Sequence, residues 1–365
     1  MLFSHVIAPD FVVDRPTGCH VIGHNLTDHE GDGPPHFYRA WRGEEVALAK
    51  IRAALYDRYG GPEVLREAHV DAPSPKAGEV LVRVHAASVN GYDVGARSGA
   101  LKIFTGRKFP KRTGLDFAGE VVDTLAGSAF KSGDRVWGVL PLHQLGSAAE
   151  LICVQPVQLA HSPVGLGFVE AAALPVVGST VITALRDMGK LKPGQRLLVR
   201  GASGGVGSIA IQLGHALGAH VTGLASAANL GFVREMGADV ALDYAITEPA
   251  SLDAFDVILD TVGSNPRAWR RRLTLTGRMI AIVPDLKHPL TSMAYFAWSR
   301  VHGERRVRFF SDKPNTGLLT DLANYVKDGS VKPIVDQVHF LSNVADAHRA
   351  MEAGGRCGKQ VLRVI

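Results

Sequence analysis

The stretch Gly201-Ala202-Ser203-Gly204-Gly205-Val206-Gly207 joins an apolar run, Arg196-Leu197-Leu198-Val199, to a helical pattern, and it decides the fold of this chain. The helical pattern carries apolar side chains on one face, at Val206, Ile209, Ala210, Leu213 and Leu217. In such a strand, tight turn and helix start, bare backbone can approach a pyrophosphate, and the helix N-terminus offers unpaired N–H groups to its charge. The spacing Ala202-x-Gly204-x-x-Gly207 is a variant of the dinucleotide fingerprint, and the alternative is an ordinary glycine-rich turn. The flanking strand and helix favour a dinucleotide site.

The bulk composition predicts a globular protein of two domains. The chain has 365 residues, of which 46% are apolar and 21% charged, and its net charge is +5. Arginines gather in two clusters, at Arg267, Arg270, Arg271, Arg272 and Arg278, and at Arg300, Arg305, Arg306 and Arg308. Such clusters could bind nucleic acid, but no aromatic pattern interleaves with them and no nucleic-acid module is present. We therefore interpret them as solvated faces and expect no nucleic-acid partner.

No stretch of the sequence predicts a membrane or secretory protein. The most apolar long segment, residues 171–185, is interrupted by proline, glycine and hydroxyl side chains and is too short to span a bilayer. The first residues lack a signal pattern, and their acidic side chains disfavour a mitochondrial transit peptide. The three cysteines, Cys19, Cys153 and Cys357, are too few and too far apart for a cysteine-built zinc site. We expect a soluble, cytoplasmic protein with no membrane partner.

The pattern of apolar residues and turn residues changes along the chain. Residues 1–50 show no sustained period, which predicts a poorly ordered extension, and their scattered histidines fit no standard zinc spacing. Residues 51–170 contain short strands, such as 79–84, separated by turn residues, which predicts a barrel-like β domain. Residues 171–311 alternate strands with helices, as a parallel sheet covered on both faces requires.

Residues 312–365 predict a return of the chain to the first domain. They carry two amphipathic helices, at 317–327 and 343–352, and Ser342 is the expected N-cap of the second helix. A final strand, 359–364, is expected to join the first domain.

Several local motifs share one family pattern. They are Tyr59-Gly60-Gly61-Pro62, Ser88-Val89-Asn90, Gly114-Leu115-Asp116-Phe117-Ala118-Gly119, Gly133-Asp134-Arg135-Val136, Ala171-Ala172-Ala173-Leu174-Pro175 and Gly358-Lys359. With these motifs, the chain from about residue 52 onward resembles the medium-chain dehydrogenase/reductase superfamily, and within it the zinc-free quinone oxidoreductase branch. The resemblance implies an α/β protein with a GroES-like β-barrel catalytic domain and a doubly wound Rossmann domain.

The resemblance to the zinc-free branch depends on three residues that cannot bind zinc. Zinc-dependent relatives carry zinc ligands where this chain has Asn90, Leu115 and Val176. Without zinc there is no Lewis acid to lower the pKa of an alcohol, so alcohol dehydrogenation is the disfavoured alternative. The resemblance implies a zinc-independent reductase that passes hydride from a nicotinamide cofactor to a quinone, enone or alkenal.

The end of the second strand of the dinucleotide domain favours NADPH over NADH. An NAD-specific site places an acidic residue there to hold the ribose 2′-hydroxyl. Here no Asp or Glu occurs from Gln212 to Arg234, and Ser226 ends the strand. By resemblance, Ser226 and Tyr244 lie beside the 2′-phosphate. Ala227 and Ala228 stand where many relatives carry a basic residue, which leaves Arg234 as a substitute charge.

The resemblance also assigns the remaining site residues. The pyrophosphate is expected at Ser203, Gly204, Gly205, Val206 and Gly207, the adenine side at Thr261 and Val262, and the nicotinamide half at Ile282, Phe309, Phe310, Thr180 and Lys359. Thr180 is expected at the carboxamide. Asn90 and Tyr92 are the candidates for the acceptor pocket, because the Asn90 amide could donate to a developing oxyanion. No residue stands out as a committed general acid, and the proton could come from water.

Two further function classes stay open at this point. A cofactor-binding protein without turnover, in a crystallin-like or sensor role, would keep the glycines while relaxing the acceptor pocket. Nucleic-acid binding through Arg270, Arg271 and Arg272 would be sensitive to salt. Relatives often pair through an edge strand of the dinucleotide sheet, so we expect a homodimer.

Overall fold

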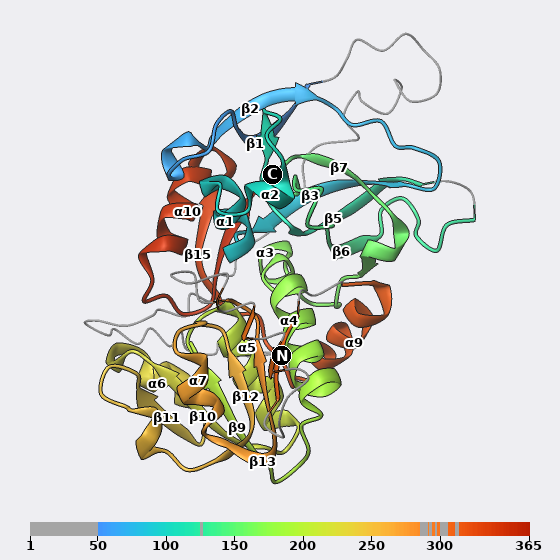
Figure 1. Ribbon diagram of the computed structural model, residues 1–365. Helices are drawn as coiled ribbons and strands as arrows, with labels where there is room; N and C mark the ends of the chain where they lie inside the picture. Colours follow the sequence, from blue (N-terminus) through green and yellow to red (C-terminus); the bar gives the residue numbers. More distant parts are fainter. Residues whose placement is uncertain are drawn as a thin grey trace, which may run out of the picture.

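The computed structural model describes residues 50–124, 127–284, 306–310 and 314–365, together with residues 291, 294, 295, 298 and 299. The described strands form three sheets in two domains, drawn one above the other in Figure 1. The extension expected at residues 1–50 lies outside the described residues except for Lys50, which begins the first strand.

The upper domain in Figure 1 is built on β-sheets. Its small sheet has the order β2-β1-β4, with β1 (Lys50–Tyr56), β2 (Arg66–Asp71) and β4 (Lys111–Arg112). Its large sheet has the order β15-β16-β3-β5-β6-β8, with β3 (Val80–Ser88), β5 (Asp116–Asp123), β6 (Arg135–Val139), β8 (Leu159–His161), β15 (Val335–Phe340) and β16 (Lys359–Arg363), while β7 (Leu151–Val154) pairs with β3. Three helices belong to this domain, α1 (Gly91–Ser98), α2 (Lys102–Thr105) and α10 (Val344–Ala353). Its core is apolar, with Phe117 and Leu159 fully buried.

The lower domain is a parallel sheet with the order β11-β10-β9-β12-β13-β14. Its strands are β9 (Arg196–Arg200), β10 (His220–Ala225), β11 (Val240–Asp243), β12 (Phe255–Asp260), β13 (Leu273–Ala281) and β14 (Arg306–Phe309). Counted within the domain, this order is 3-2-1-4-5-6, that of a doubly wound dinucleotide fold. The order reverses between β9 and β12, so the carboxyl ends of these two strands mark the expected ligand crevice.

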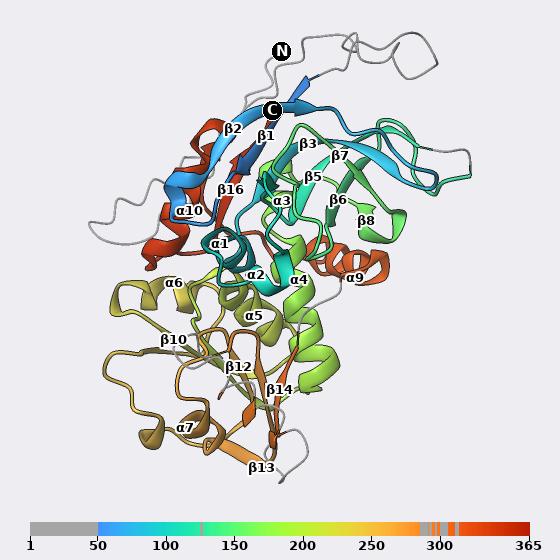
Figure 2. The ribbon, with the colours of Figure 1, turned by 45° about the horizontal axis from the view of Figure 1, so that its top comes forward.

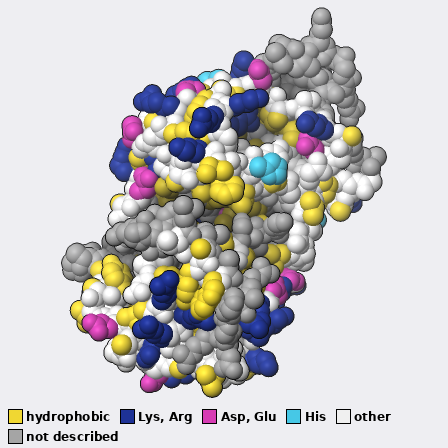
Figure 3. All heavy atoms as spheres, in the orientation of Figure 1, with side chains coloured by type: hydrophobic (Ala, Val, Ile, Leu, Met, Phe, Trp, Pro, Cys, Tyr) yellow, Lys and Arg dark blue, Asp and Glu magenta, His cyan; other side chains and the backbone are white. Residues whose placement is uncertain are grey.

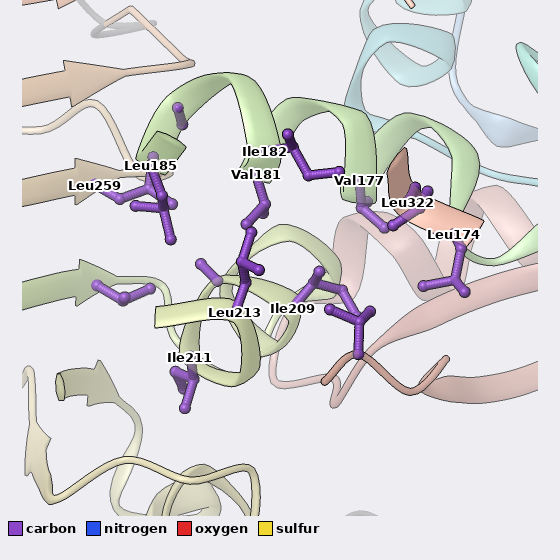
Figure 4. Close-up of a cluster of buried hydrophobic side chains, with 14 of the residues drawn as sticks. Leu174, Val177, Val181, Ile182, Leu185, Ile209, Ile211, Leu213, Leu259 and Leu322 are labelled. Atoms are coloured by element: carbon purple, nitrogen blue, oxygen red, sulfur yellow. The ribbon is translucent and has the colours of Figure 1, made fainter. Parts of the chain in front are cut away.

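Helices α5 (Gly205–Ala216), α6 (Leu230–Glu235) and α7 (Pro266–Arg270) pack on the parallel sheet, as does a π-helix (Thr183–Gly189) that continues α4 (Pro175–Ile182). Helix α3 (Phe168–Ala172) packs on the large sheet of the upper domain, and α9 (Thr316–Lys327) contacts α4 and β8. Figure 4 shows α4 packed on α5, with Val181 of α4 pointing toward Leu213 of α5. Leu322 of α9 packs against the same cluster. The apolar faces predicted for these helices therefore form the core that supports the glycine turn. Among the described helices, none combines the length and apolar character needed to cross a bilayer.

The end of the chain ties the two domains together. Strand β16 pairs antiparallel with β3, with Val361 opposite Ser88. Just before β16, Gly358 forms a parallel bridge with Gly204 of the glycine turn. One short segment is thus bonded to both domains.

The predicted elements agree with the structure except at their ends. The strand predicted at 79–84 is longer, because β3 continues to Ser88. The expected N-cap at Ser342 is wrong. Ser342 lies in a 3-10 turn (Leu341–Asn343), and Asn343 precedes α10 without a side-chain capping bond. The Ser342 hydroxyl instead donates to Asn343 Oδ1 at 2.9 Å.

Candidate active site

The glycine turn follows β9 at the crevice and opens α5. Gly201 has a φ of +74°, a conformation that glycine adopts readily. A Cβ at Gly207 would overlap the carbonyl oxygen of Gly201 and lie 2.8 Å from Ala202 Cα. Only glycine therefore lets α5 start this close to the strand. The first turn of α5 carries no acidic residue, so its N–H groups and the positive end of the helix dipole suit an anion.

Neighbouring segments hold the turn in shape. Gly358 N donates to Ser203 O at 3.0 Å, and Asn229 Nδ2 donates to Ser203 Oγ at 3.1 Å and to Gly355 O at 3.1 Å. Because Asn229 is buried, these bonds are shielded from water and fix the turn before any ligand arrives. The residues that make the site are thus preorganised for a dinucleotide phosphate.

Lys359 connects the glycine turn with the upper domain. Its side chain passes Gly205, where a Cβ would lie 2.7 Å from Lys359 Cδ. Its Nζ donates to Val89 O at 2.9 Å and to Asn90 Oδ1 at 2.6 Å. Burial lowers the pKa of the ammonium group, and the nearby carboxylates of Asp116 and Asp93 oppose this effect. An ammonium has three N–H donors, so one remains for a ligand after these two bonds.

The Asn90 side chain is held at both of its ends. Its Oδ1 accepts the Lys359 bond, while its Nδ2 donates to Asp116 Oδ1 at 3.0 Å and weakly to Ser88 O at 3.4 Å. Asp116 also accepts from Ser88 Oγ at 2.6 Å and from Val176 N at 3.4 Å. In this arrangement the Asn90 amide hydrogens face protein oxygens, so the amide is committed to Asp116 and not directed at an acceptor.

Asp93 completes this buried network from the first turn of α1. Its two oxygens accept from Asn90 N at 2.9 Å and from Gly114 N at 3.0 Å. Burial nevertheless raises the pKa of Asp93 to about 6, because the charged form loses its hydration, while these two bonds oppose the rise. The acceptor side therefore holds one cation, Lys359, among two carboxyl groups. We define the acceptor-side network as Ser88, Asn90, Asp93, Asp116 and Lys359.

Comparison with known proteins identifies the family. Residues 76–164 match the alcohol dehydrogenase GroES-like domain, and residues 236–362 match the zinc-binding dehydrogenase domain. The chloroplast envelope quinone oxidoreductase homolog of Arabidopsis thaliana is 34% identical, covering 86% of this chain and 98% of that protein. The chain belongs to the quinone oxidoreductase branch of the medium-chain dehydrogenase/reductase superfamily.

Other members of this branch give the same result. The mitochondrial NAD(P)H oxidoreductase RTN4IP1 of Homo sapiens is 33% identical, covering 89% of this chain and 95% of that one. The solved quinone oxidoreductase of Coxiella burnetii superposes with a TM-score of 0.80 at 27% identity, over 87% of this chain and all of that chain. The predicted fold class, a GroES-like domain with a Rossmann domain, is confirmed, and the chain is an oxidoreductase of this family.

Three of the residues predicted for the nicotinamide half, Ile282, Phe309 and Phe310, lie at the carboxyl ends of β13 and β14. Ile282 N donates to Asp260 O at 3.1 Å, and Phe309 ends β14 opposite Ala281 of β13. Thr180 is buried in α4, three residues after Val177, which contacts the glycine turn at Gly205. Phe310 follows β14 and is half-buried. Tyr92 sits in α1, where its hydroxyl donates to Leu142 O at 3.0 Å.

A buried ion pair supports the loop that the sequence predicts for the adenine side. Arg200 Nη1 lies 2.7 Å from Asp260 Oδ1, and both side chains are buried at the ends of β9 and β12. Asp260 Oδ1 also accepts from Val262 N and Gly263 N at 3.0 Å each, and the Thr261 hydroxyl donates to Arg200 O at 2.7 Å. These bonds shape the loop that carries Thr261 and Val262. In the sequence, this ion pair is indicated by Arg200 and Asp260, each of which ends an apolar run.

The ribose end contains an acidic residue that the sequence argument missed. Ser226 follows β10 directly, and Tyr244 N donates to Ala225 O at 3.0 Å, so these two residues do lie together. In the sheet register, Asp243 of β11 stands opposite Ala225. Its carboxylate accepts from Ala245 N at 2.9 Å. Arg234 is exposed, but one of its guanidinium nitrogens lies 3.5 Å from Ala241 O, so it faces the sheet.

Other expected or excluded sites can now be placed. Within the described ranges, no group of three or more His, Cys, Asp and Glu side chains is arranged to hold a metal.

Arg267, Arg270 and Arg271 line a cavity of about 880 Å³ with Tyr295 and Trp298, apart from the residues of the active site. Figure 3 shows basic side chains on the face of the lower domain that this view presents. The cluster does carry aromatic neighbours, which the sequence pattern did not reveal.

Proposed function

We propose that this oxidoreductase is a zinc-independent, NADPH-dependent reductase of quinones, enones or alkenals. The observation that carries the proposal is the position of Lys359, which contacts both the glycine turn and Asn90. The glycine turn fits a dinucleotide, since the missing Cβ at Gly207 lets α5 start close to β9, and the first turn of α5 carries no acidic residue that would repel a phosphate. When bound, the nicotinamide would supply the hydride.

The acceptor-side network would prepare Lys359 for charge stabilisation. Asp116 orients the Asn90 amide, and Asn90 Oδ1 then fixes the Lys359 ammonium in place. We propose that the remaining N–H of Lys359 stabilises negative charge on the acceptor oxygen and can deliver a proton to it. This assigns to Lys359 the donor role that the sequence had suggested for Asn90, and gives Asn90 a positioning role. Tyr92 and Thr180 would form the walls around the acceptor and the nicotinamide.

Zinc independence rests on the chemistry of the donor set. Asn90, Leu115 and Val176 stand where zinc-dependent relatives carry ligands, and Leu115 and Val176 have no donor atom in the side chain. The Asn90 amide is moreover bonded to Asp116 and Lys359. Treatment of the purified protein with a chelator is expected to leave its turnover unchanged.

The NADPH preference is supported by Ser226 and by the absence of acidic side chains from Gln212 to Arg234, while Asp243 argues against it. Ser226 follows the second strand directly, whereas Asp243 ends the third and already accepts a backbone N–H. We therefore expect kcat/KM to favour NADPH by about tenfold, equivalent to about 1.4 kcal/mol.

An acceptor screen tests the proposal. The full chain would be assayed with NADPH and NADH against a soluble quinone, an enone, an alkenal and, in the reverse direction, a primary alcohol. Reduction of a quinone or enone with NADPH is the expected result. A clear NADH preference would overturn the cofactor assignment. Tight NADPH binding without reduction of any acceptor would favour a cofactor-binding protein in a crystallin-like or sensor role.

The proposal also includes the oligomeric state of the protein and its location in the cell. In the described part of the sheet, β14 is the outer strand next to β13, and we propose a homodimer that pairs along this edge. Light scattering of the purified protein would give a mass of twice the monomer. We also retain the predicted cytoplasmic location, which imaging of a tagged protein would test.

A further inference from the structure

The segment 101–112 of the upper domain combines exposed apolar side chains with unbalanced positive charge. It reads Leu101-Lys102-Ile103-Phe104-Thr105-Gly106-Arg107-Lys108-Phe109-Pro110-Lys111-Arg112, and it contains no acidic residue. Ile103 is 87% exposed and Phe104 is 74% exposed, both on the short helix α2. We call Ile103, Phe104 and the exposed cations Lys102, Arg107 and Lys108 the α2 tip.

Hydrogen bonds and a ring contact hold the chain around the α2 tip in place, so the exposed side chains keep their positions. The Tyr59 hydroxyl donates to Gly106 O, and Lys111 Nζ donates to Thr105 O at 2.6 Å. Phe109 packs edge-on against Tyr59 with their ring centroids 5.0 Å apart. The segment therefore turns one aromatic residue, Phe109, inward while it holds Ile103 and Phe104 outward.

The charges of the α2 tip are available to an anionic surface. Lys102, Arg107 and Lys108 are exposed, and none of them forms an ion pair with a described residue. Two adjacent apolar side chains flanked by cations match a phospholipid interface, in which apolar groups enter the acyl boundary and cations meet phosphates. A stable protein partner needs about 800 Å² on each side, more than two side chains supply. The charge pattern thus favours a lipid surface over a second copy of the chain.

The α2 tip is close in the chain and in space to the acceptor-side network. Asn90 is the N-cap of α1, whose eight residues span about 12 Å, and Leu101 N donates back to Gly95 O at 3.1 Å. Figure 2 shows α1 and α2 side by side in the upper domain. The α2 tip therefore belongs to the domain that carries most of the acceptor-side network, and α1 connects the two.

We propose that the α2 tip docks the protein peripherally on anionic phospholipid bilayers and so brings the acceptor site to lipid-dissolved acceptors. The second part of this inference rests on the proposed reductase function, since quinones with long apolar tails reside in bilayers. It replaces the expectation that this protein has no membrane partner. Docking of this kind needs no spanning helix.

Vesicle sedimentation with the full chain tests the docking surface. The probes are vesicles of phosphatidylcholine alone and of phosphatidylcholine with about one third phosphatidylserine. We expect binding to the anionic vesicles only, reduced at least about tenfold in the double variant Ile103→Asp, Phe104→Asp and weakened by salt. Ile246→Asp is the matched control, because Ile246 is an apolar side chain that is 83% exposed on the other domain. It is expected to bind like the unaltered protein.

Three results would overturn docking through the α2 tip. They are no binding to anionic vesicles, an equal loss in the Ile246→Asp control, and full binding by the double variant. A change of molecular mass in the double variant would assign the tip to a contact between copies of the chain. Thermal denaturation of each variant would separate these results from misfolding.

Activity assays keep this inference separate from the proposed function. With a water-soluble quinone, the double variant is expected to turn over normally, while its rate with a quinone embedded in anionic vesicles falls. Reduction of soluble acceptors without vesicle binding would refute the docking surface alone. Vesicle binding without reduction of any acceptor would refute the reductase function and leave the docking surface standing.

Discussion

The glycine turn and the acceptor-side network meet at Lys359, yet they are built by opposite means. The turn, residues 201–207, is one continuous stretch whose shape depends on the absence of side chains. The network joins side chains from β3, α1, β5 and β16, and it depends on matched charges and hydrogen bonds. The difference predicts different responses to substitution. The turn should respond to added volume, and the network should respond to removed charge.

The largest effect is expected from added volume at Gly207. A Cβ there would overlap Gly201 O, so we expect Gly207→Ala to destabilise the domain by about 1–3 kcal/mol and to abolish measurable NADPH binding. Thermal denaturation and a fluorescence titration with NADPH would measure both. Gly204→Ala is the control for stability alone, because Gly204 has a φ of −71° and the nearest protein atom would be 3.5 Å away. An equal loss of stability in both variants would contradict the steric argument.

Removal of the Lys359 charge is expected to break the network while sparing the turn. In Lys359→Met, the stem that packs on Gly205 is retained, but the ammonium is lost. We expect kcat to fall about 100-fold, with the Kd for NADPH changed much less. Steady-state kinetics and the same titration separate the two effects, and Lys192→Met, at an exposed lysine, serves as the control. A change in Kd without a change in kcat would assign Lys359 to cofactor binding alone.

Asn90→Ala tests whether Asn90 acts through Lys359. The variant loses the bond to Lys359 Nζ and the bond to Asp116, so we expect kcat to fall about tenfold, by less than in Lys359→Met. The double variant should be no slower than Lys359→Met, because positioning has no further effect once the ammonium is absent. Unaltered turnover in Asn90→Ala would remove the positioning role.

Charge at the ribose end should change cofactor choice while leaving the network intact. Ala227 is exposed and follows Ser226, so Ala227→Arg is expected to improve the kcat/KM for NADPH about fivefold through the 2′-phosphate. Ser226→Asp should shift the preference toward NADH by repelling that phosphate. If neither variant alters the ratio of the two kcat/KM values, the 2′ position is bound elsewhere.

The smallest effect is expected from pH. The pKa of Asp93, raised to about 6 by burial, lies above its ordinary value of 3.8, so the folded state binds this proton more tightly than the unfolded state. The stability that this gives is fully present below pH 3.8 and is lost as pH rises through 6. We expect a matching inflection near pH 6 in kcat but not in the Kd for NADPH. Asp93→Asn should remove the inflection, and its persistence would assign it to another group.

The sequence predicted the fold because local patterns carry most of the information about it. Apolar runs such as Arg196–Arg200 are buried strands, and the glycine spacing requires close approach of strand and helix. The cofactor half of the site, near Gly204 and Ile282, could be placed because the carboxyl ends of parallel strands share one edge. Only the family resemblance suggested Lys359.

The rest of the site could not be predicted because it depends on contacts between distant segments. Lys359 meets Asn90 across 269 residues of chain. Asp243 reaches the ribose end through the register of β11 with β10, and no count of residues after the glycines reveals this. The commitment of the Asn90 amide to Asp116 likewise follows from how β3 and β5 pair. Composition and periodicity contain none of these distances.

The bridge between Gly204 and Gly358 limits how the two domains can move. Gly358 N is bonded to Ser203 O, so a rotation of one domain against the other that keeps this bond must pivot close to it. Points near a pivot travel little, and Lys359 is the next residue along the chain. Any rotation of the two domains that keeps this bond would therefore displace Lys359 and the glycine turn less than the outer parts of the molecule.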